Sequence, residues 1–455
     1  MKKSILAGIF IAFTIALFAQ NANKLNGTNW QMTISGNTDL LLNLKIKGNK
    51  FSFRSREGST KDIIGKQYIL GRLLGKVNPT TILVTGKYYF EKDTLKLTGK
   101  YMSLTSKQDF NGKIYNEQLD AVMSNNRMTG YKINNNEALA PYQQIAAEAL
   151  KITEENLYNP ALIQTEQWKT FRTKVTTLSA KVKDDYEFEK AFNFQVQSLP
   201  FSHFGISIKM PETPISSNTA KATEAKKNTK FEIKNINEHT VLFTVKTFSA
   251  QAEEIIPFID SLKAMKFANL IIDLRNNGGG TIASALPLAS YLVNDTMYGG
   301  LFLTRKYFST HNSLPAPTEY KNFPLFSEAS FPLIIEGIHK HDGLCLVVYP
   351  DAENFKGNVY ILTNKRTAST CEPLVYGLKQ NQRATIVGER TAGAMLNGER
   401  FGLNGKFNLW MPTADYYTID GNKIDKTGVT PNIAVEPDMA LEKTLEYIDE
   451  KQMNH

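Results

Sequence analysis

Residues 269–293 read NLIIDLRNNGGGTIASALPLASYLV and combine an apolar run, a glycine-rich turn and a helix-like stretch. The nearly unbroken apolar run from Leu270 to Leu274 is typical of a strand buried on both faces. Gly278, Gly279 and Gly280 follow, and glycine tolerates a positive φ and the close approach of another group. Free amides at a helix start favour an anion, so this turn is either an anion-binding turn or merely a flexible one. A phosphate loop is disfavoured because no Lys-Ser/Thr pair follows the glycines.

A second junction of the same kind occupies residues 358–393, NVYILTNKRTASTCEPLVYGLKQNQRATIVGERTAG. Its turn carries Ser369, and a side chain at such a turn is exposed at the carboxyl edge of the sheet beside helix amides. Ser369 and Glu372 also fit a capping box, in which the hydroxyl accepts the Glu372 amide. The residues alone leave a nucleophile and a helix cap both open.

Strands and helices alternate along the rest of residues 231–455, which predicts an α/β domain. Residues 20–138 alternate apolar and polar side chains and predict an all-β domain, a barrel or a sandwich. Residues 139–204 change to helical spacing and predict a helical subdomain, and residues 205–230 are predicted to be a polar loop.

The first residues resemble a secretory signal peptide, predicted to cover 1–19. Lys2 and Lys3 precede an apolar stretch from Ile5 to Phe18, and small residues lie before Gln20. An uncleaved anchor is the alternative, although a spanning helix needs about 20 apolar residues. We therefore expect an exported protein, periplasmic or secreted, without a stable membrane span.

Composition excludes several other classes. Of 455 residues, 42% are hydrophobic and 21% charged, which is normal for a globular protein of two or three domains. The net charge of +9 is spread along the chain, so we expect no nucleic-acid partner. Cys345 and Cys371 make no disulfide framework, although they could form one bridge.

Taken together, the two junctions resemble the C-terminal processing or tail-specific serine peptidases, a family that includes the tricorn core protease. The matching segments are DLRNNGG at 273–279, TASTCE at 367–372, VGERTAG at 387–393 and GVTPN at 428–432, where the family has GVxPD. The resemblance covers about residues 140 to 445. It implies an α/β core similar to Clp protease and crotonase, hydrolysis of peptides or unfolded proteins through an acyl-enzyme, and no cofactor or metal.

Carried over by position, the resemblance implies that Ser369 is the nucleophile. The amide of Thr370 and that of Gly278 or Gly279 would form the oxyanion hole. Bacterial tail-specific members use a Lys as the base, and this chain has Ala394 at that place.

Tricorn-like members use a Ser-His pair and a downstream Glu, which here correspond to Ser202, His203 and Asp425. Only about 70 residues separate His203 from Asp273, which leaves no comfortable room for the PDZ domain that the family often inserts there. His203 is therefore the expected general base, positioned by Ser202 or by Asp425. The ordinary pKa of His predicts a loss of activity near pH 6 to 7. A His merely packed between two Phe residues is the alternative.

Two non-catalytic functions remain open. The retinoid-binding relatives of this family show that the fold can carry ligands without peptidase work, so a ligand- or peptide-binding protein is the main alternative. The N-terminal β domain could also be a lipocalin-like carrier.

We predict that the mature chain begins at or near Gln20, because the preceding residues have the charged, apolar and small order of a cleaved signal. Mass spectrometry of the exported protein checks this. An intact Met1 in exported protein would show that the segment is not cleaved.

Overall fold

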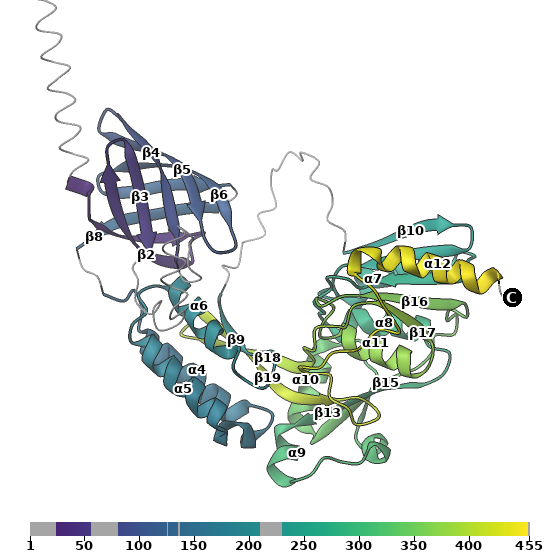
Figure 1. The fold of residues 1–455 in the computed structure, drawn as a ribbon. Coiled ribbons are helices and arrows are strands. Elements are labelled where there is room, and N and C mark those ends of the chain that lie inside the picture. Colours follow the sequence, from purple (N-terminus) through teal and green to yellow (C-terminus); the bar gives the residue numbers. More distant parts are fainter. Residues whose placement is uncertain (1–23, 56–80, 125, 135–136, 210–229, 454–455) are drawn as a thin grey trace, which may run out of the picture.

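The computed structural model describes residues 24–55, 81–124, 126–134, 137–209 and 230–453. The predicted signal peptide and residues 210–229 of the predicted polar loop 205–230 lie outside these ranges. Figure 1 shows a barrel at one end of the molecule, helices beneath it and an α/β core at the other end. A long hairpin runs from the core towards the helices.

The N-terminal region is a closed antiparallel barrel, which confirms the all-β prediction and selects a barrel over a sandwich. The first strand pairs with both the second and the last, and this closes the sheet. Its interior is filled by buried apolar side chains that include Trp30, Phe53 and Phe110. The strands are β1 (Asn29–Ile34), β2 (Thr38–Lys47), β3 (Lys50–Ser55), β4 (Leu83–Glu91), β5 (Thr94–Met102), β6 (Lys107–Tyr115), β7 (Gln118–Met123) and β8 (Asn126–Ile133).

Helices follow the barrel, as the spacing of apolar residues predicts. They are α4 (Tyr142–Asn156), the 3-10 helix η1 (Pro160–Gln164), α5 (Glu166–Ser179) and α6 (Asp185–Val196). The side chain of Asp184 caps α6 by accepting the amide of Glu187 at 2.9 Å. Apolar side chains of α4, α5 and α6 share one core with Phe407 and Leu409, which belong to the long hairpin.

Two sheets form the α/β core, which confirms the predicted fold class. The first has the order β10 (Phe231–Asn237), β11 (Thr240–Val245), β12 (Asn269–Asp273), β16 (Asn358–Thr363), β17 (Ala384–Gly388) and β20 (Ile433–Ala434). From β11 to β20 the strands are parallel, so their carboxyl ends lie at one edge. The second has the order β14 (Leu325–Phe326), β15 (Gly343–Val348), β13 (Met297–Thr304), β19 (Phe407–Tyr417) and β18 (Leu396–Leu403).

Helices pack on both faces of the first sheet. One face shares a core with the second sheet and with α7 (Ala252–Lys263), α8 (Ile282–Leu292), α10 (Phe331–Lys340) and α11 (Cys371–Gln380). The other face is covered by α12 (Ala440–Met453), which follows the 3-10 helix η3 (Pro437–Met439). The second sheet also packs against α9 (Arg305–Thr310) and the 3-10 helix η2 (Pro317–Asn322).

One strand was not predicted. Residues 205–208, which the sequence placed in the polar loop, form β9 (Gly205–Ile208) because they pair antiparallel with Phe407–Trp410 of β19. Within the described residues, we find no helix with the length and apolarity that a membrane crossing requires.

Candidate active site

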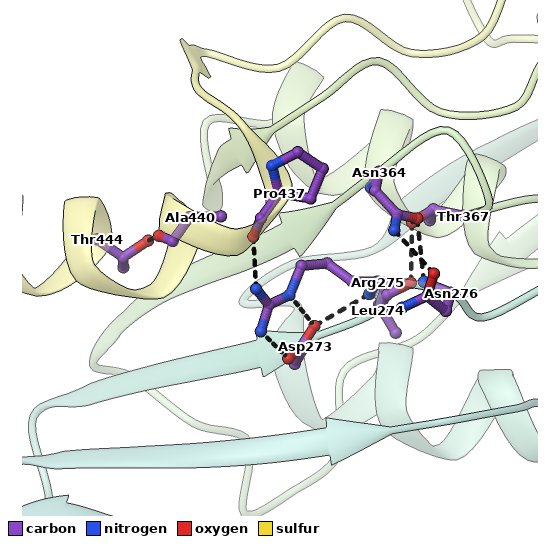
Figure 2. A network of polar contacts seen from close by, with 9 residues as sticks. All are labelled: Asp273, Leu274, Arg275, Asn276, Asn364, Thr367, Pro437, Ala440 and Thr444. Carbon is purple, nitrogen blue, oxygen red and sulfur yellow. Dashed lines mark hydrogen bonds and ion pairs between the residues drawn. The ribbon is translucent and has the colours of Figure 1, made fainter.

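Two loops that follow neighbouring strands are tied together by side-chain amides (Figure 2). β12 ends at Asp273 and β16 at Thr363, and the two strands are paired in parallel. The backbone amide of Asn276 donates to Oδ1 of Asn364 at 3.0 Å, and Nδ2 of Asn364 donates to Oδ1 of Asn276 at 3.0 Å. This exchange fixes the glycine turn relative to the turn that carries Ser369.

Thr367 and Arg275 reinforce the same edge (Figure 2). The hydroxyl of Thr367 donates to the carbonyl of Leu274 at 2.8 Å, which joins the second loop to the end of the first strand. Arg275 pairs with Asp273 at 2.6 Å and donates to the carbonyl of Pro437 at 2.5 Å. These positions of the DLRNN and TAS segments therefore hold the architecture and do not face the site.

The glycine turn packs directly against Ser369. A Cβ added to Gly279 would lie 2.6 Å from the Cβ of Ser369, and the residue has φ +92°, so only glycine fits without strain. The amide of Gly279 donates to Oδ1 of the fully buried Asn277 at 2.9 Å. The amide of Gly278 has no protein acceptor among the described residues. The structure thus favours Gly278 over Gly279 as a donor to a bound oxyanion.

Ser369 has φ +56°, in the left-handed region that a Ser adopts only when its surroundings impose it. The expected capping box is half formed, because Oε2 of Glu372 accepts the Ser369 amide at 3.1 Å. The Glu372 amide, however, donates to the backbone carbonyl of Ser369 at 2.7 Å and not to its hydroxyl. The Ser369 hydroxyl is therefore free of a capping role.

Glu372 is fully buried and holds the loop after β17 against this turn. Its carboxylate accepts the hydroxyl of Thr391 at 2.6 Å, the amide of Gly393 at 2.8 Å and the amide of Ala394 at 2.9 Å. Burial raises the pKa of Glu372, while these donors act in the opposite direction. Ala394 contributes a backbone amide here and, as expected, no basic side chain.

His203 reaches Ser369 from the other side of the site. Its Nε2 lies 3.2 Å from the Ser369 hydroxyl, and its Nδ1 lies 2.8 Å from the Ser202 hydroxyl. The amide of Ser202 donates to Oδ2 of Asp425 at 3.1 Å. The four predicted side chains are thus brought together, and of the two expected partners for the second ring nitrogen it is Ser202 that makes the contact.

The Phe residues on either side of His203 belong to the core of the helical region. Phe201 and Phe204 are buried in the helical core, and Phe204 contacts the ring of Trp168 at 6.1 Å between centroids. His203 has φ +55°, in the left-handed region, and its ring lies 6.4 Å from that of Trp410.

Electrostatics keep the imidazole neutral. Burial, followed by the nearby positive charge of Lys426, lowers the pKa of His203 from 6.5 to about 4. The expectation of a transition near pH 6 to 7 is therefore too high, since it used the ordinary value of an exposed His. Burial also raises the pKa of Asp425, against the hydrogen bonds from Ser202.

Two hollows meet at Ser369 and His203. The first is an apolar cavity with an empty volume of about 930 Å³ including its open mouth, and it enters the core between α8, α10 and β15. Its walls include Ala289, Phe302, Leu346 and Met395. The second is an open groove bordered by the glycine turn, Trp410 and Arg400. An extended chain in the groove could place one side chain in the cavity beside the Ser369 hydroxyl.

Neither cysteine competes with Ser369. Cys345 and Cys371 are both buried and free. Burial raises the pKa of the Cys345 thiol to about 11 and that of the Cys371 thiol well above its usual range.

The part of the chain that carries these loops is similar in sequence to known proteins. The sequence profile described as Peptidase family S41 matches residues 239–435. This stretch is a peptidase family S41 domain. Its two tied strand ends, the Ser369 turn and Asp425 all fall inside the match, whereas Ser202 and His203 lie before it.

Curated relatives match the S41 domain over a similar length. A carboxyl-terminal-processing protease from Synechocystis is 27% identical over 190 residues, or 42% of this chain and 36% of that protein. A chloroplastic C-terminal processing peptidase from Tetradesmus obliquus is 27% identical over 179 residues, or 38% of this chain and 30% of that protein. The match thus spans about a third of these relatives. A lipoprotein from Streptococcus agalactiae, a solved structure, has 19% identity and a TM-score of 0.47, with 70% of this chain and 99% of that one covered.

Sequence reasoning missed several residues that shape the site of the S41 domain. Asn276 and Asn364 were taken as parts of turns, although their hydrogen bonds join the two loops. Asn277 was also passed over, although its side chain holds the Gly279 amide and donates to the carbonyl of Val245. Trp410 gave no signal, because it lies beside His203 only through the pairing of β19 with β9. The asparagines could have been singled out, since they lie within a few residues of the ends of two buried parallel strands.

We predict that Glu372→Gln destabilises the protein by about 2 to 4 kcal/mol, because an amide cannot accept all the hydrogen bonds of the buried carboxylate. Denaturant unfolding measures this change. Glu389→Gln is the matched control, since Glu389 pairs with the exposed Lys365, and we expect it to change the free energy of unfolding far less than Glu372→Gln does. Equal effects of the two substitutions would contradict the role given to Glu372.

Proposed function

We propose that the protein is an exported serine endopeptidase that hydrolyses peptide bonds through an acyl-enzyme on Ser369, with His203 as general base. The observation that carries this proposal is the line of hydrogen bonds from Ser202 through His203 to Ser369, at 2.8 and 3.2 Å. The family of residues 239–435 supports the same reaction class. Export rests on the charged and apolar order of residues 1–19.

In the first half of the reaction, the Ser369 hydroxyl attacks the carbonyl carbon of the scissile bond and its proton passes to Nε2 of His203. Ser202 holds Nδ1, so that Nε2 is the nitrogen that faces the hydroxyl. The amides of Thr370 and Gly278 stabilise the oxyanion that forms on the carbonyl oxygen. His203 then gives its proton to the leaving amine as the carbon–nitrogen bond breaks.

Water completes the cycle. It attacks the ester carbonyl of the acyl-enzyme while Nε2 of His203 takes one of its protons. The tetrahedral intermediate collapses, the ester bond to Ser369 breaks, and the proton on His203 returns to the Ser369 oxygen. Asp425 takes no proton in this scheme and keeps Ser202 in place through the Ser202 amide.

Ser369→Ala and His203→Ala should each lower kcat by at least about a thousandfold, and the double variant should be hardly worse, because the two residues act as one unit. Steady-state hydrolysis of a peptide library and labelling by a fluorophosphonate probe measure the effects. If the wild-type protein neither labels nor hydrolyses, the alternative of a binding protein on the same fold stands. Activity that survives in His203→Ala would mean that another group is the base.

The pH profile follows from the lowered pKa. His203 serves as a base only when neutral, so kcat/KM should fall as the pH drops through about 4 and not through 6.5. The rate of labelling by the fluorophosphonate probe, measured over a pH series with unfolding followed in parallel, locates this fall on the acidic side of the pH profile. A fall near pH 6.5 would contradict the buried, neutral imidazole.

The apolar cavity supports a preference for substrates with a large apolar side chain beside the cleaved bond. Ser369 and Thr370 lie at its mouth, and its walls are almost entirely apolar. A charged side chain would lose its hydration there without gaining a partner. A Leu or Phe side chain would instead remove apolar surface from water.

We predict that Ala289→Phe, which narrows this cavity, lowers the preference for Leu over Ala at the cleaved residue by about tenfold or more. The ratio of kcat/KM for two matched peptides measures it, and a folding defect cancels from the ratio. Ser290→Phe on the same helix is the control, because Ser290 does not line the cavity. An unchanged ratio in Ala289→Phe would show that the side chain binds elsewhere.

A further inference from the structure

A buried charge cluster joins three separate parts of the chain. Nζ of Lys406, in the turn between β18 and β19, lies 2.7 Å from Oδ2 of Asp39 in the barrel. The same ammonium lies 2.5 Å from Oδ2 of Asp185 at the start of α6. The Asp185 side chain is fully buried, and the other two are about three-quarters buried, with 24% and 22% exposed.

The carboxylates of this cluster also hold the barrel by its backbone. The amide of Asp39 donates to Asp185 at 2.7 Å, and the amide of Leu41 donates to Asp184 at 3.0 Å. Burial, followed by the charge of Glu187, raises the pKa of Asp184 to about 8, so this end of α6 is crowded with buried acids. Lys406 supplies positive charge to Asp185 and Asp39, and its removal would leave the fully buried Asp185 carboxylate poorly compensated.

The turn that carries Lys406 continues into the strands beside His203. The carbonyl of Lys406 accepts the amide of Lys209 at 2.8 Å, which extends the pairing of β9 with β19. Along this ladder Trp410 pairs with Gly205, two residues after His203. Backbone hydrogen bonds therefore run without a break from the turn of Lys406 to Gly205, two residues after His203.

Helix α6 makes a second connection between the barrel and the same strand. Its start bears Asp184 and Asp185, which bind the barrel, and nearer its end Asn193 binds β9. Nδ2 of Asn193 donates to the carbonyl of Ile206 at 2.8 Å, and Oδ1 accepts the Ile206 amide at 2.9 Å. Figure 1 shows α6 between the barrel and β9.

We propose that Lys406 is a positioning residue, which couples docking of the N-terminal barrel to the placement of His203 against Ser369. This inference rests on the proposed function, in which His203 is the general base. The barrel then supports the geometry of the site. The hairpin β18–β19 and helix α6 connect the barrel to the segment that carries His203.

The test compares Lys406→Met, Lys406→Arg and Lys174→Met in the full chain. Lys406→Met keeps the aliphatic stem and removes the charge, so kcat and the fluorophosphonate labelling rate should fall about tenfold while KM changes by less than about twofold. In Lys406→Arg, which keeps the positive charge, kcat and the labelling rate should lie within about threefold of the wild-type values. Lys174 is exposed on α5, and Lys174→Met should match the wild type.

Hydrogen exchange of residues 203–209 provides a readout that does not need activity. Lys406→Met should speed exchange there and in β2, whereas Lys174→Met should not. Faster exchange in a chain whose wild type neither labels nor hydrolyses would reject the proposed function and leave the coupling standing. Unchanged exchange at 203–209, or a kcat equal to that of the wild type, would overturn the coupling.

Asp39→Asn is a second, milder variant that tests the same contact if Lys406→Met does not fold. It removes the barrel's charged partner of Lys406 and keeps the Asp39 amide that binds Asp185. We expect a smaller loss of kcat in the same direction, and a double variant with Lys406→Met that is less impaired than the product of the two single effects. Independent, multiplying effects would show that the two side chains do not act together.

Discussion

The exchange of hydrogen bonds between Asn276 and Asn364 is the interaction on which the site depends. Loops that leave the edge of a parallel sheet lose the ladder partners of their backbone groups. An Asn side chain carries both a donor and an acceptor, so it can replace those partners at short range. The exchange sets the distance between two turns that contain left-handed residues, Asn276 at φ +63° and Ser369 at φ +56°. Such conformations persist only where the surroundings impose them.

This constraint explains why so few positions of the motifs face the site. The side chains of Asp273 and Arg275 pair with each other, and that of Thr367 donates to the end of β12. The Glu372 carboxylate accepts hydrogen bonds from the adjoining loop. Ser369 keeps its hydroxyl free because backbone and carboxylate groups do the capping. The motif is long because a rigid turn needs many supporting hydrogen bonds, whereas the chemistry needs few groups.

Local sequence patterns made much of the fold and part of the candidate site predictable. The buried strands β12 and β16 and the position of Ser369 follow from two apolar runs that end in turns. The all-β character of the N-terminal region follows from alternation along 20–138, although that pattern fits a barrel and a sandwich equally. Features that depend on distant partners were not predictable. β9 is a strand only because it pairs with residues about 200 positions later. The low pKa of His203 likewise arises from burial in the folded chain. The choice of Gly278 over Gly279 depends instead on a local contact, the hydrogen bond from the Gly279 amide to Asn277, which the residue pattern did not single out.

The two halves of the site consequently have different supports. The turn of Ser369 is held within one sheet edge, by contacts among loops that adjoin neighbouring strands. His203 arrives on a short segment whose flanking Phe residues lie in the helical core and whose strand is paired to the hairpin. The 3.2 Å contact between them therefore joins two pieces that could shift relative to each other. Because a small displacement at such a contact is enough to lower a rate, the packing of the helices and the hairpin matters as much to this site as the glycine turn does.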